Sequence, residues 1–246
     1  MHVNPAEMEA LDLAEWFVPR DLAEYATLAK RDRRVEWLAS RVVLKRMLTE
    51  DGLIESPLHA HIRKNAKGAP HVVVYNPGTG HYARLRCSLS HKGPLALAAY
   101  SRNPKTRVGI DVERRSWRLA RLRREFVHES DLMADPDDST GNLTALWAFK
   151  EAATKLLGVG MAYGLSKIQC RETSAGVCEL RDAGGNHYAG RHVWFGKYAV
   201  ALVVDLETPA AGPAPHVKRR KYTWWQRIAR ARKLRRMRKT RTAAGS

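Results

Sequence analysis

Apolar side chains recur every three or four residues in several stretches of the chain, which is the spacing of one face of an α-helix. This spacing predicts helices over residues 22–28, 33–48 and 143–157. Gly158 follows the last of these stretches and is typical of the residue that ends a helix. A shorter helix is expected over residues 119–128.

Between these helices, β-branched and alternating apolar residues predict strands that follow one another in meanders. Turns rich in Gly, Pro and Asn separate them, as at residues 76–80. A polar loop is expected over residues 135–142. The expected strands cover residues 71–75, 85–90, 95–100 and 107–114, with further strands between 166 and 206.

Helices followed by a meander occur twice along the chain, and this repetition predicts an α+β fold with two halves. The strand at 94–100 resembles the strand at 198–204, which favours related halves, although short Ala/Leu/Val strands recur widely. We expect three parts: an N-terminal subdomain at 1–106, a C-terminal subdomain at 107–208, and a flexible linker with a basic tail at 209–246.

The net charge changes this picture only at the C-terminal end. The 246 residues contain 43 Lys and Arg against 25 Asp and Glu, a formal net charge of +18. Residues 209–246 hold 13 of the basic residues and no acidic one, so residues 1–208 have a net charge of only +5. A basic tail is typical of proteins that bind nucleic acid. The charges in the rest of the chain are nearly balanced, however, and it shows no motif that reads the grooves of DNA.

Several classes of protein are excluded by composition. No apolar run is long enough to cross a bilayer, and residues 1–5 lack the features of a secretion signal. The cysteines Cys87, Cys170 and Cys178 are odd in number and form no CxxC motif. We therefore expect neither a disulfide framework nor a zinc cluster nor a membrane partner, and a cytoplasmic location.

Two carboxylates share one face of the strand predicted at 107–114. Asp111 and Glu113 are two residues apart, so their Cα atoms are about 7 Å apart and their side chains can converge on one hard cation. Gly109 on the same face would let a bulky ligand approach the backbone. The simpler alternative is a solvated face whose acids are neutralised by Arg114 and Arg115.

A third carboxylate, Glu151, lies at the edge of the apolar stripe of the helix at 143–157. Burying it is costly unless a cation compensates its charge. Lys155 could do so as an ordinary helical i,i+4 pair. The functional alternative is a metal held jointly with Asp111 and Glu113. Three carboxylates suit Mg²⁺, and Lys150 and Lys155 beside them would suit a phosphate-bearing substrate.

Taken together, these and other motifs resemble the signatures of the 4′-phosphopantetheinyl transferase superfamily, Sfp type. The similar elements occur in family order over roughly residues 20–205. In chain order they are a helix similar to "K-R-x-x-E-x-L-x-x-R" at 33–41, Gly-Ala-Pro at 68–70, Ser-Leu-Ser-His at 88–91, Gly-Ile-Asp-Val-Glu at 109–113, Phe-Val-His-Glu at 126–129 and Trp-Ala-Phe-Lys-Glu-Ala-Ala-Thr-Lys at 147–155.

The resemblance implies a fold of two similar α/β subdomains related by a pseudo-twofold axis, with the active site between them. It implies transfer of the 4′-phosphopantetheine group of coenzyme A to a serine of an apo acyl or peptidyl carrier protein. The serine hydroxyl would attack the β-phosphate of coenzyme A and release 3′,5′-ADP. The partners would be coenzyme A and a carrier protein that is generally acidic, and a chain that forms its own cleft is expected to be a monomer.

The same resemblance assigns roles to single residues. Asp111, Glu113 and Glu151 would hold Mg²⁺, with Glu151 as the best candidate for the general base and Lys155 as a cation on the diphosphate. The side chains expected to meet coenzyme A are Arg34, Arg41, Ser90, His91, Lys150 and Lys155.

One departure from the family pattern concerns coenzyme A. Ala69 stands where the "G-K-P" turn has a lysine, so Lys64 or Lys67 would have to replace that contact, and Lys92 could add another.

Two rival hypotheses remain at this point. The first is a nucleic-acid-binding protein or an Mg²⁺-dependent nuclease that uses the basic tail, although we do not expect a nucleic-acid partner. The second is a non-catalytic relative that binds coenzyme A or a carrier protein without turnover.

Overall fold

The computed structural model describes residues 2–66, 68–133, 138–160 and 163–205. All of them belong to one compact unit, Met1–Thr208. The predicted linker and basic tail at 209–246 lie outside the described residues. Within the described part, no helix combines the length and the apolar composition that a membrane span requires.

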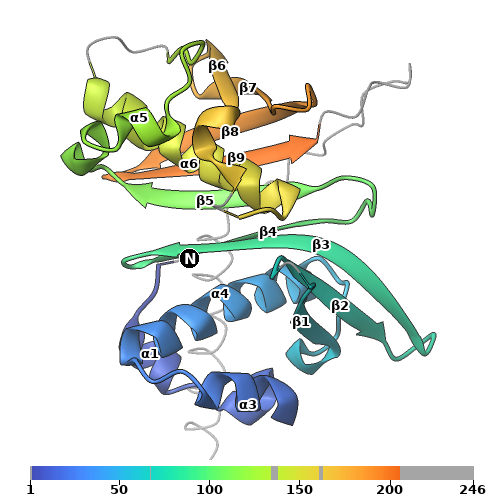
Figure 1. Cartoon of the computed structure of the whole chain (residues 1–246). Coiled ribbons are helices and arrows are strands. Elements are labelled where there is room, and N and C mark those ends of the chain that lie inside the picture. Colours follow the sequence, from blue (N-terminus) through green and yellow to red (C-terminus); the bar gives the residue numbers. More distant parts are fainter. Residues whose placement is uncertain (1, 67, 134–137, 161–162, 206–246) are drawn as a thin grey trace, which may run out of the picture. The chain divides into compact units, whose positions relative to one another are not determined.

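The first half of the unit is an antiparallel sheet in the order β1-β2-β3-β4, with the long helix α4 packed against it (Figure 1). The core at this contact contains Leu44, Leu48, Ile62 and Val72. The bounds are α1 Pro5–Glu9, α2 Leu13–Trp16, α3 Pro19–Ala26, α4 Arg31–Glu50, β1 Ala60–Lys64, β2 Pro70–Asn76, β3 His81–Lys92 and β4 Leu95–Ser101.

The second half is an antiparallel sheet in the order β5-β9-β8-β7-β6, and helix α6 covers one of its faces (Figure 1). Phe149, Ala152 and Leu156 of α6 pack there against Leu180 and Val203 of the strands. The bounds are β5 Val108–Arg114, α5 Arg123–Phe126, α6 Ser139–Leu157, β6 Gln169–Ser174, β7 Val177–Arg181, β8 His187–Phe195 and β9 Tyr198–Asp205, with short 3₁₀ helices at Trp117–Ala120 and Leu165–Lys167.

The α+β class is confirmed, since helices and antiparallel sheets alternate along the chain. The expected helices at 22–28 and 33–48 overlap α3 and α4, and the helix at 143–157 lies within α6. The continuous helix expected at 119–128 is wrong, because a 3₁₀ helix and the short α5 occupy this region. The pseudo-twofold relation and the limits of the two subdomains stay predictions.

Strand β5 lies at the edge of the second sheet, next to β3 of the first (Figure 1). Its backbone pairs with β9 on one side only. On the other side, the N–H groups of Ile110 and Val112 donate to the hydroxyls of Ser88 (3.0 Å) and Ser90 (3.3 Å). The two serines therefore satisfy edge-strand N–H groups that would otherwise be buried without a partner.

Gly109 of β5 is the point where helix α6 comes closest to the sheet. A Cβ at this position would lie 1.9 Å from the carbonyl oxygen of Ala152 and 2.8 Å from the backbone nitrogen of Leu156. The expectation that Gly109 admits a ligand is therefore wrong, because the helix backbone occupies the space. The close approach brings α6 against the strand that carries Asp111 and Glu113.

Replacement of Gly109 by alanine is expected to lower the free energy of unfolding by about 2–3 kcal/mol. The added methyl would collide with backbone atoms, which cannot rotate away as a side-chain tip can. Urea unfolding monitored by circular dichroism measures the change. Gly78→Ala is the control, because a Cβ there meets only the Asn76 side chain, at 3.3 Å. Equal losses in the two variants would contradict this prediction.

Candidate metal and anion site

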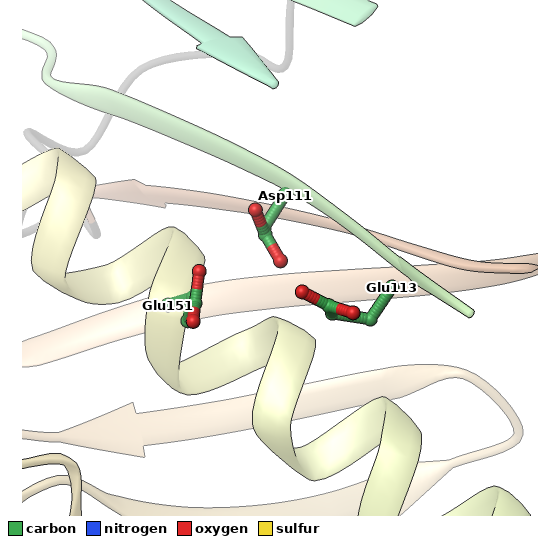
Figure 2. Close-up of side chains that lie close together, drawn as sticks. All are labelled: Asp111, Glu113 and Glu151. Atoms are coloured by element: carbon green, nitrogen blue, oxygen red, sulfur yellow. The ribbon is translucent and has the colours of Figure 1, made fainter. Parts of the chain in front are cut away.

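The structure brings together the three carboxylates that the sequence singled out. Asp111 and Glu113 extend from the same face of β5, and Glu151 extends toward them from α6 (Figure 2). One oxygen from each side chain lies within 4.8 Å of the others. Such a spacing allows all three to contact one small cation.

Asp111 is the most buried member of this cluster, with 2% of its surface exposed. Its Oδ1 accepts hydrogen bonds from Ser90 Oγ at 2.8 Å and from Lys155 Nζ at 2.6 Å. Its Oδ2 is buried and has no hydrogen-bond partner among the residues that the structure describes. A buried carboxylate oxygen without a partner is costly. An oxygen-preferring divalent cation such as Mg²⁺ would satisfy it, so the donor set fits that metal.

The pKa values of the two glutamates show how poorly the cluster tolerates three negative charges. Burial, together with the charge of Asp111, raises the pKa of Glu151 to about 7. A hydrogen bond from Trp147 and the charge of Lys155 oppose this rise. Burial also raises the pKa of Glu113, although Lys92 lies 2.7 Å from its carboxylate. A bound cation would favour the ionised form of both acids, against the effects of burial and of the neighbouring negative charge.

Lys155 lies at the junction of β3, β5 and α6. Its Nζ donates to Asp111 Oδ1, to Ser90 Oγ at 3.0 Å and to the carbonyl oxygens of Ile110 (3.3 Å) and Leu89 (3.4 Å). Lys155 forms its ion pair with Asp111 of β5. This pair joins two elements, unlike the i,i+4 pair with Glu151 within one helix that the sequence also allowed. The lysine places one positive charge directly against the acidic cluster.

Ser90 holds Asp111 in place. Its hydroxyl donates to Asp111 and accepts from Lys155 and from the N–H of Val112. One donor and two acceptor positions are thereby used, which is the full capacity of a hydroxyl. The expected direct contact of Ser90 with coenzyme A therefore finds no support in this geometry.

A cleft of about 360 Å³ opens beside the acidic cluster. Besides the three carboxylates and Lys155, its lining includes the cations Arg41, Lys64 and Lys92 and the imidazole of His91. These four side chains come from the first half of the unit, whereas the acids come from the second. The cleft thus combines a candidate metal site with a wall suited to phosphate groups.

The basic side chains of this wall lie next to acidic partners. Arg41 is stacked 3.8 Å over the ring of Trp37 and lies 3.2 Å from Glu24, and burial lowers its pKa to about 10. Lys64 lies 3.1 Å from the same Glu24. His91 Nε2 lies 3.3 Å from a carboxylate oxygen of Glu36, and burial lowers the pKa of this histidine.

Two residues expected at the site lie elsewhere. Lys150 is fully buried, and its Nζ donates to the carbonyl oxygen of Phe126 and to Asp131 Oδ2, both at 2.6 Å. Its expected contact with the diphosphate is therefore wrong, because the side chain points into the core. Arg34 is exposed, donates to the carbonyl oxygen of Leu28 at 2.6 Å and does not line the cleft.

Some contributors were not predicted from sequence. The indole of Trp147 hydrogen-bonds Glu151, and its position one helical turn before Glu151 is the signal that could have revealed this contact. Ser88 accepts a hydrogen bond from the N–H of Ile110 in β5, and no sequence pattern predicts this contact between distant segments. Lys64, one of the two proposed substitutes at the turn containing Ala69, does line the cleft, whereas Lys67 is outside the described residues.

Residues 107–203 match the model of the 4′-phosphopantetheinyl transferase superfamily. The matched segment begins one residue before β5 and ends within β9, so it includes the three carboxylates and Lys155. The family resemblance of the motifs is thereby confirmed over this segment.

Three named proteins to which the chain is similar are also called phosphopantetheinyl transferases. The chain is 36% identical over 98 residues to the 4′-phosphopantetheinyl transferase psf-1 of Bacillus pumilus, covering 38% of this chain and 41% of that protein. It is 26% identical over 145 residues to the human L-aminoadipate-semialdehyde dehydrogenase-phosphopantetheinyl transferase, covering 54% and 45%. A phosphopantetheinyl transferase of Thraustochytrium is 23% identical over 213 residues, covering 78% and 69%. The matches thus span less than half the length of the human and Bacillus relatives.

Proposed function

We propose that this protein transfers the 4′-phosphopantetheine group of coenzyme A to a serine of an apo acyl or peptidyl carrier protein, in an Mg²⁺-dependent reaction that releases 3′,5′-ADP. The observation that carries the proposal is the buried, unpartnered Oδ2 of Asp111 within a group of three convergent carboxylates, next to a cationic cleft. The superfamily match over the same residues supports it.

Asp111, Glu113 and Glu151 are the residues that would hold Mg²⁺. When bound there, the ion would neutralise charge on the diphosphate of coenzyme A as the phosphorus–oxygen bond breaks. Lys155 adds a second positive charge at the same place, from a side chain that Ser90 and two carbonyl oxygens already orient. Such preorganised charge costs no rearrangement during the reaction.

Glu151 is the proposed acceptor of the serine proton. The hydroxyl oxygen forms a bond to the β-phosphorus, the bond from that phosphorus to the 3′,5′-ADP oxygen breaks, and the proton goes to a carboxylate oxygen of Glu151. A general base must lie within hydrogen-bond reach of the proton that it takes, and Glu151 can serve if it binds the metal through one carboxylate oxygen and keeps the other free. The Trp147 indole orients this carboxylate.

The wall formed by Arg41, Lys64 and His91 is the proposed site for the phosphorylated nucleotide end of coenzyme A. Lys64 would provide the charge that the family's turn lysine supplies and Ala69 cannot.

Each half of the unit places one long helix, α4 or α6, against an antiparallel sheet. We therefore retain the proposal of two pseudo-twofold-related subdomains with the cleft between them, acting as a monomer.

The direct test is incubation of the full chain with coenzyme A, Mg²⁺ and an apo carrier protein. We expect mass spectrometry to show a gain of one phosphopantetheine on the carrier, and none in the presence of EDTA. Fatty-acid, polyketide and nonribosomal-peptide carriers should be tried in parallel, together with a carrier whose acceptor serine is alanine. If none of the three carrier types is modified, the assignment is refuted.

A further inference from the structure

The ammonium group of Lys92 lies against one of the three carboxylates. Its Nζ is 2.7 Å from Glu113 Oε2 and donates to Glu113 Oε1 at 3.1 Å, so both oxygens of this carboxylate face the lysine. Lys92 is the last residue of β3 and Glu113 belongs to β5, and the ion pair therefore joins the two halves of the unit. In the metal-free chain, the lysine neutralises the charge with which Glu113 would attract a metal ion.

The backbone of Lys92 is fixed, whereas its side chain is free to rotate. Lys92 pairs with Leu95 across the hairpin between β3 and β4. Its side chain keeps 45% of its surface exposed, compared with 16% for Glu113. Lys92 lines the cleft of about 360 Å³ that contains the three carboxylates and also a second cleft of about 540 Å³, which it shares with Glu113 and Trp147. The ammonium can therefore leave Glu113 without any change in the fold.

Two lysines determine the formal charge next to the three convergent carboxylates (Figure 2). Lys155 pairs with Asp111 and Lys92 with Glu113, whereas Glu151 forms no ion pair among the described residues. With all three acids ionised, these five side chains carry a formal charge of −1. A bound Mg²⁺ would change this charge to +1, which attracts a diphosphate. Without Lys92, the same two states would carry −2 and 0.

We propose that Lys92 exchanges one partner for another: it pairs with Glu113 in the free chain and with the diphosphate of coenzyme A once Glu113 binds Mg²⁺. The inference rests on the proposed function, which assigns the metal and the diphosphate to this cleft. In the free chain, Lys92 weakens Mg²⁺ binding, because its ammonium repels the ion and pairs with one of its ligands. In the metal-bound chain, the released ammonium strengthens the binding of coenzyme A. The exchange thus couples the two binding events.

The first measurement is isothermal titration of the full chain with Mg²⁺, in the absence of coenzyme A and of a carrier protein. Lys92→Met removes the ammonium and keeps an apolar side chain of similar length. This variant is expected to bind Mg²⁺ at least about threefold more tightly than the parent chain at low salt. Lys92→Arg keeps the positive charge and should stay within about twofold of the parent.

The second measurement is titration with coenzyme A at saturating Mg²⁺, where the effect should have the opposite sign. Lys92→Met is expected to bind coenzyme A at least about threefold more weakly than the parent, because the diphosphate loses a cation. In EDTA the same substitution should weaken coenzyme A binding less, because Lys92 then pairs with Glu113. A merely structural role of Lys92 would weaken the binding of both ligands.

Three results would overturn the inference: unchanged affinity of Lys92→Met for Mg²⁺, loss of affinity for both ligands, or equal weakening of coenzyme A binding with Mg²⁺ and in EDTA. Lys105→Met is the matched control, because Lys105 is exposed and lines neither cleft. This control should bind both ligands like the parent chain.

The binding measurements need no turnover, so they separate this inference from the proposed function. If the two affinities of Lys92→Met shift as expected but the parent chain modifies no carrier protein, the proposed function fails and the exchange stands. If the parent modifies a carrier and Lys92→Met binds Mg²⁺ and coenzyme A like the parent, the proposed function stands and the exchange is wrong.

Discussion

Replacement of Asp111 by asparagine is expected to abolish Mg²⁺ binding and to lower kcat/KM for phosphopantetheine transfer by at least about 10³-fold. Asparagine has nearly the same shape and can still accept hydrogen bonds from Ser90 and Lys155 at one oxygen. Its amide nitrogen, however, would replace Oδ2, the buried oxygen that lacks a partner. The variant thus removes a metal-binding oxygen while preserving the packing around it.

Two measurements check this expectation. Isothermal titration with Mg²⁺ should show binding to the parent chain and none to the Asp111→Asn variant, and the mass-spectrometric transfer assay gives the loss of rate. Glu179→Gln is the control, since Glu179 is exposed on β7 and its replacement also removes one negative charge. Transfer by Asp111→Asn at the parent rate would show that the acidic cluster is not the catalytic centre.

Replacement of Glu151 by glutamine is expected to act in opposite directions on stability and on activity. Without metal, Glu151 is an acid whose pKa is raised from 4.5 to about 7 by burial and by Asp111. Glutamine removes the cost of ionising it, so the metal-free variant should be more stable than the parent at pH 8 by at most about 3 kcal/mol. Transfer should be lost, because a metal ligand and the proposed proton acceptor are both gone.

The pH dependence of stability shows in which direction Glu151→Gln should act. A raised carboxyl pKa means that the folded state holds more protons than the unfolded state between about pH 4.5 and 7. The Glu151 contribution therefore makes the metal-free chain less stable as pH rises through that window, and the full cost applies above it. Urea unfolding in EDTA at pH 5 and pH 8 should show a stabilising effect of Glu151→Gln only at the higher pH. A variant that is less stable than the parent at pH 8 would contradict the expectation.

The periodicity of the sequence was sufficient to predict most of what brings the acids together. An i,i+2 spacing on a strand puts Asp111 and Glu113 on one face, and the edge of an apolar helical stripe puts Glu151 toward the sheet. These are local geometric consequences, independent of the rest of the chain. The α+β class follows from the same patterns.

Contacts between distant elements could not be predicted in this way. Lys150 and Glu151 are neighbours on α6 but point in different directions, and Lys150 turns inward because Asp131 and the Phe126 carbonyl meet it. No spacing rule reveals those partners. The role of Gly109 depends likewise on how closely α6 approaches, which is a property of packing.

An arginine-rich segment at 114–124 was visible in the sequence but was concealed by the total charge. Residues 1–208 have a net charge of only +5, because acidic residues elsewhere compensate the six arginines between 114 and 124. Judged by net charge alone, the tail at 209–246 is the main basic feature of the chain. Local charge on an exposed segment next to the acids is the more informative quantity, because screening limits electrostatic steering to about 8 Å at physiological salt.

The two serine hydroxyls that meet β5 have a consequence for motion within the unit. The strand is joined to β9 by a backbone ladder, but its N–H groups at Ile110 and Val112 are joined to β3 only through Ser88 and Ser90. Separating β5 from β3 would leave these two N–H groups without partners and would also break the contacts of Ser90 with Asp111 and of Lys92 with Glu113, so the junction is expected to be rigid. Slow deuterium exchange at these two amides would report this rigidity, which holds Asp111, whose peptide lies between them, in a fixed position.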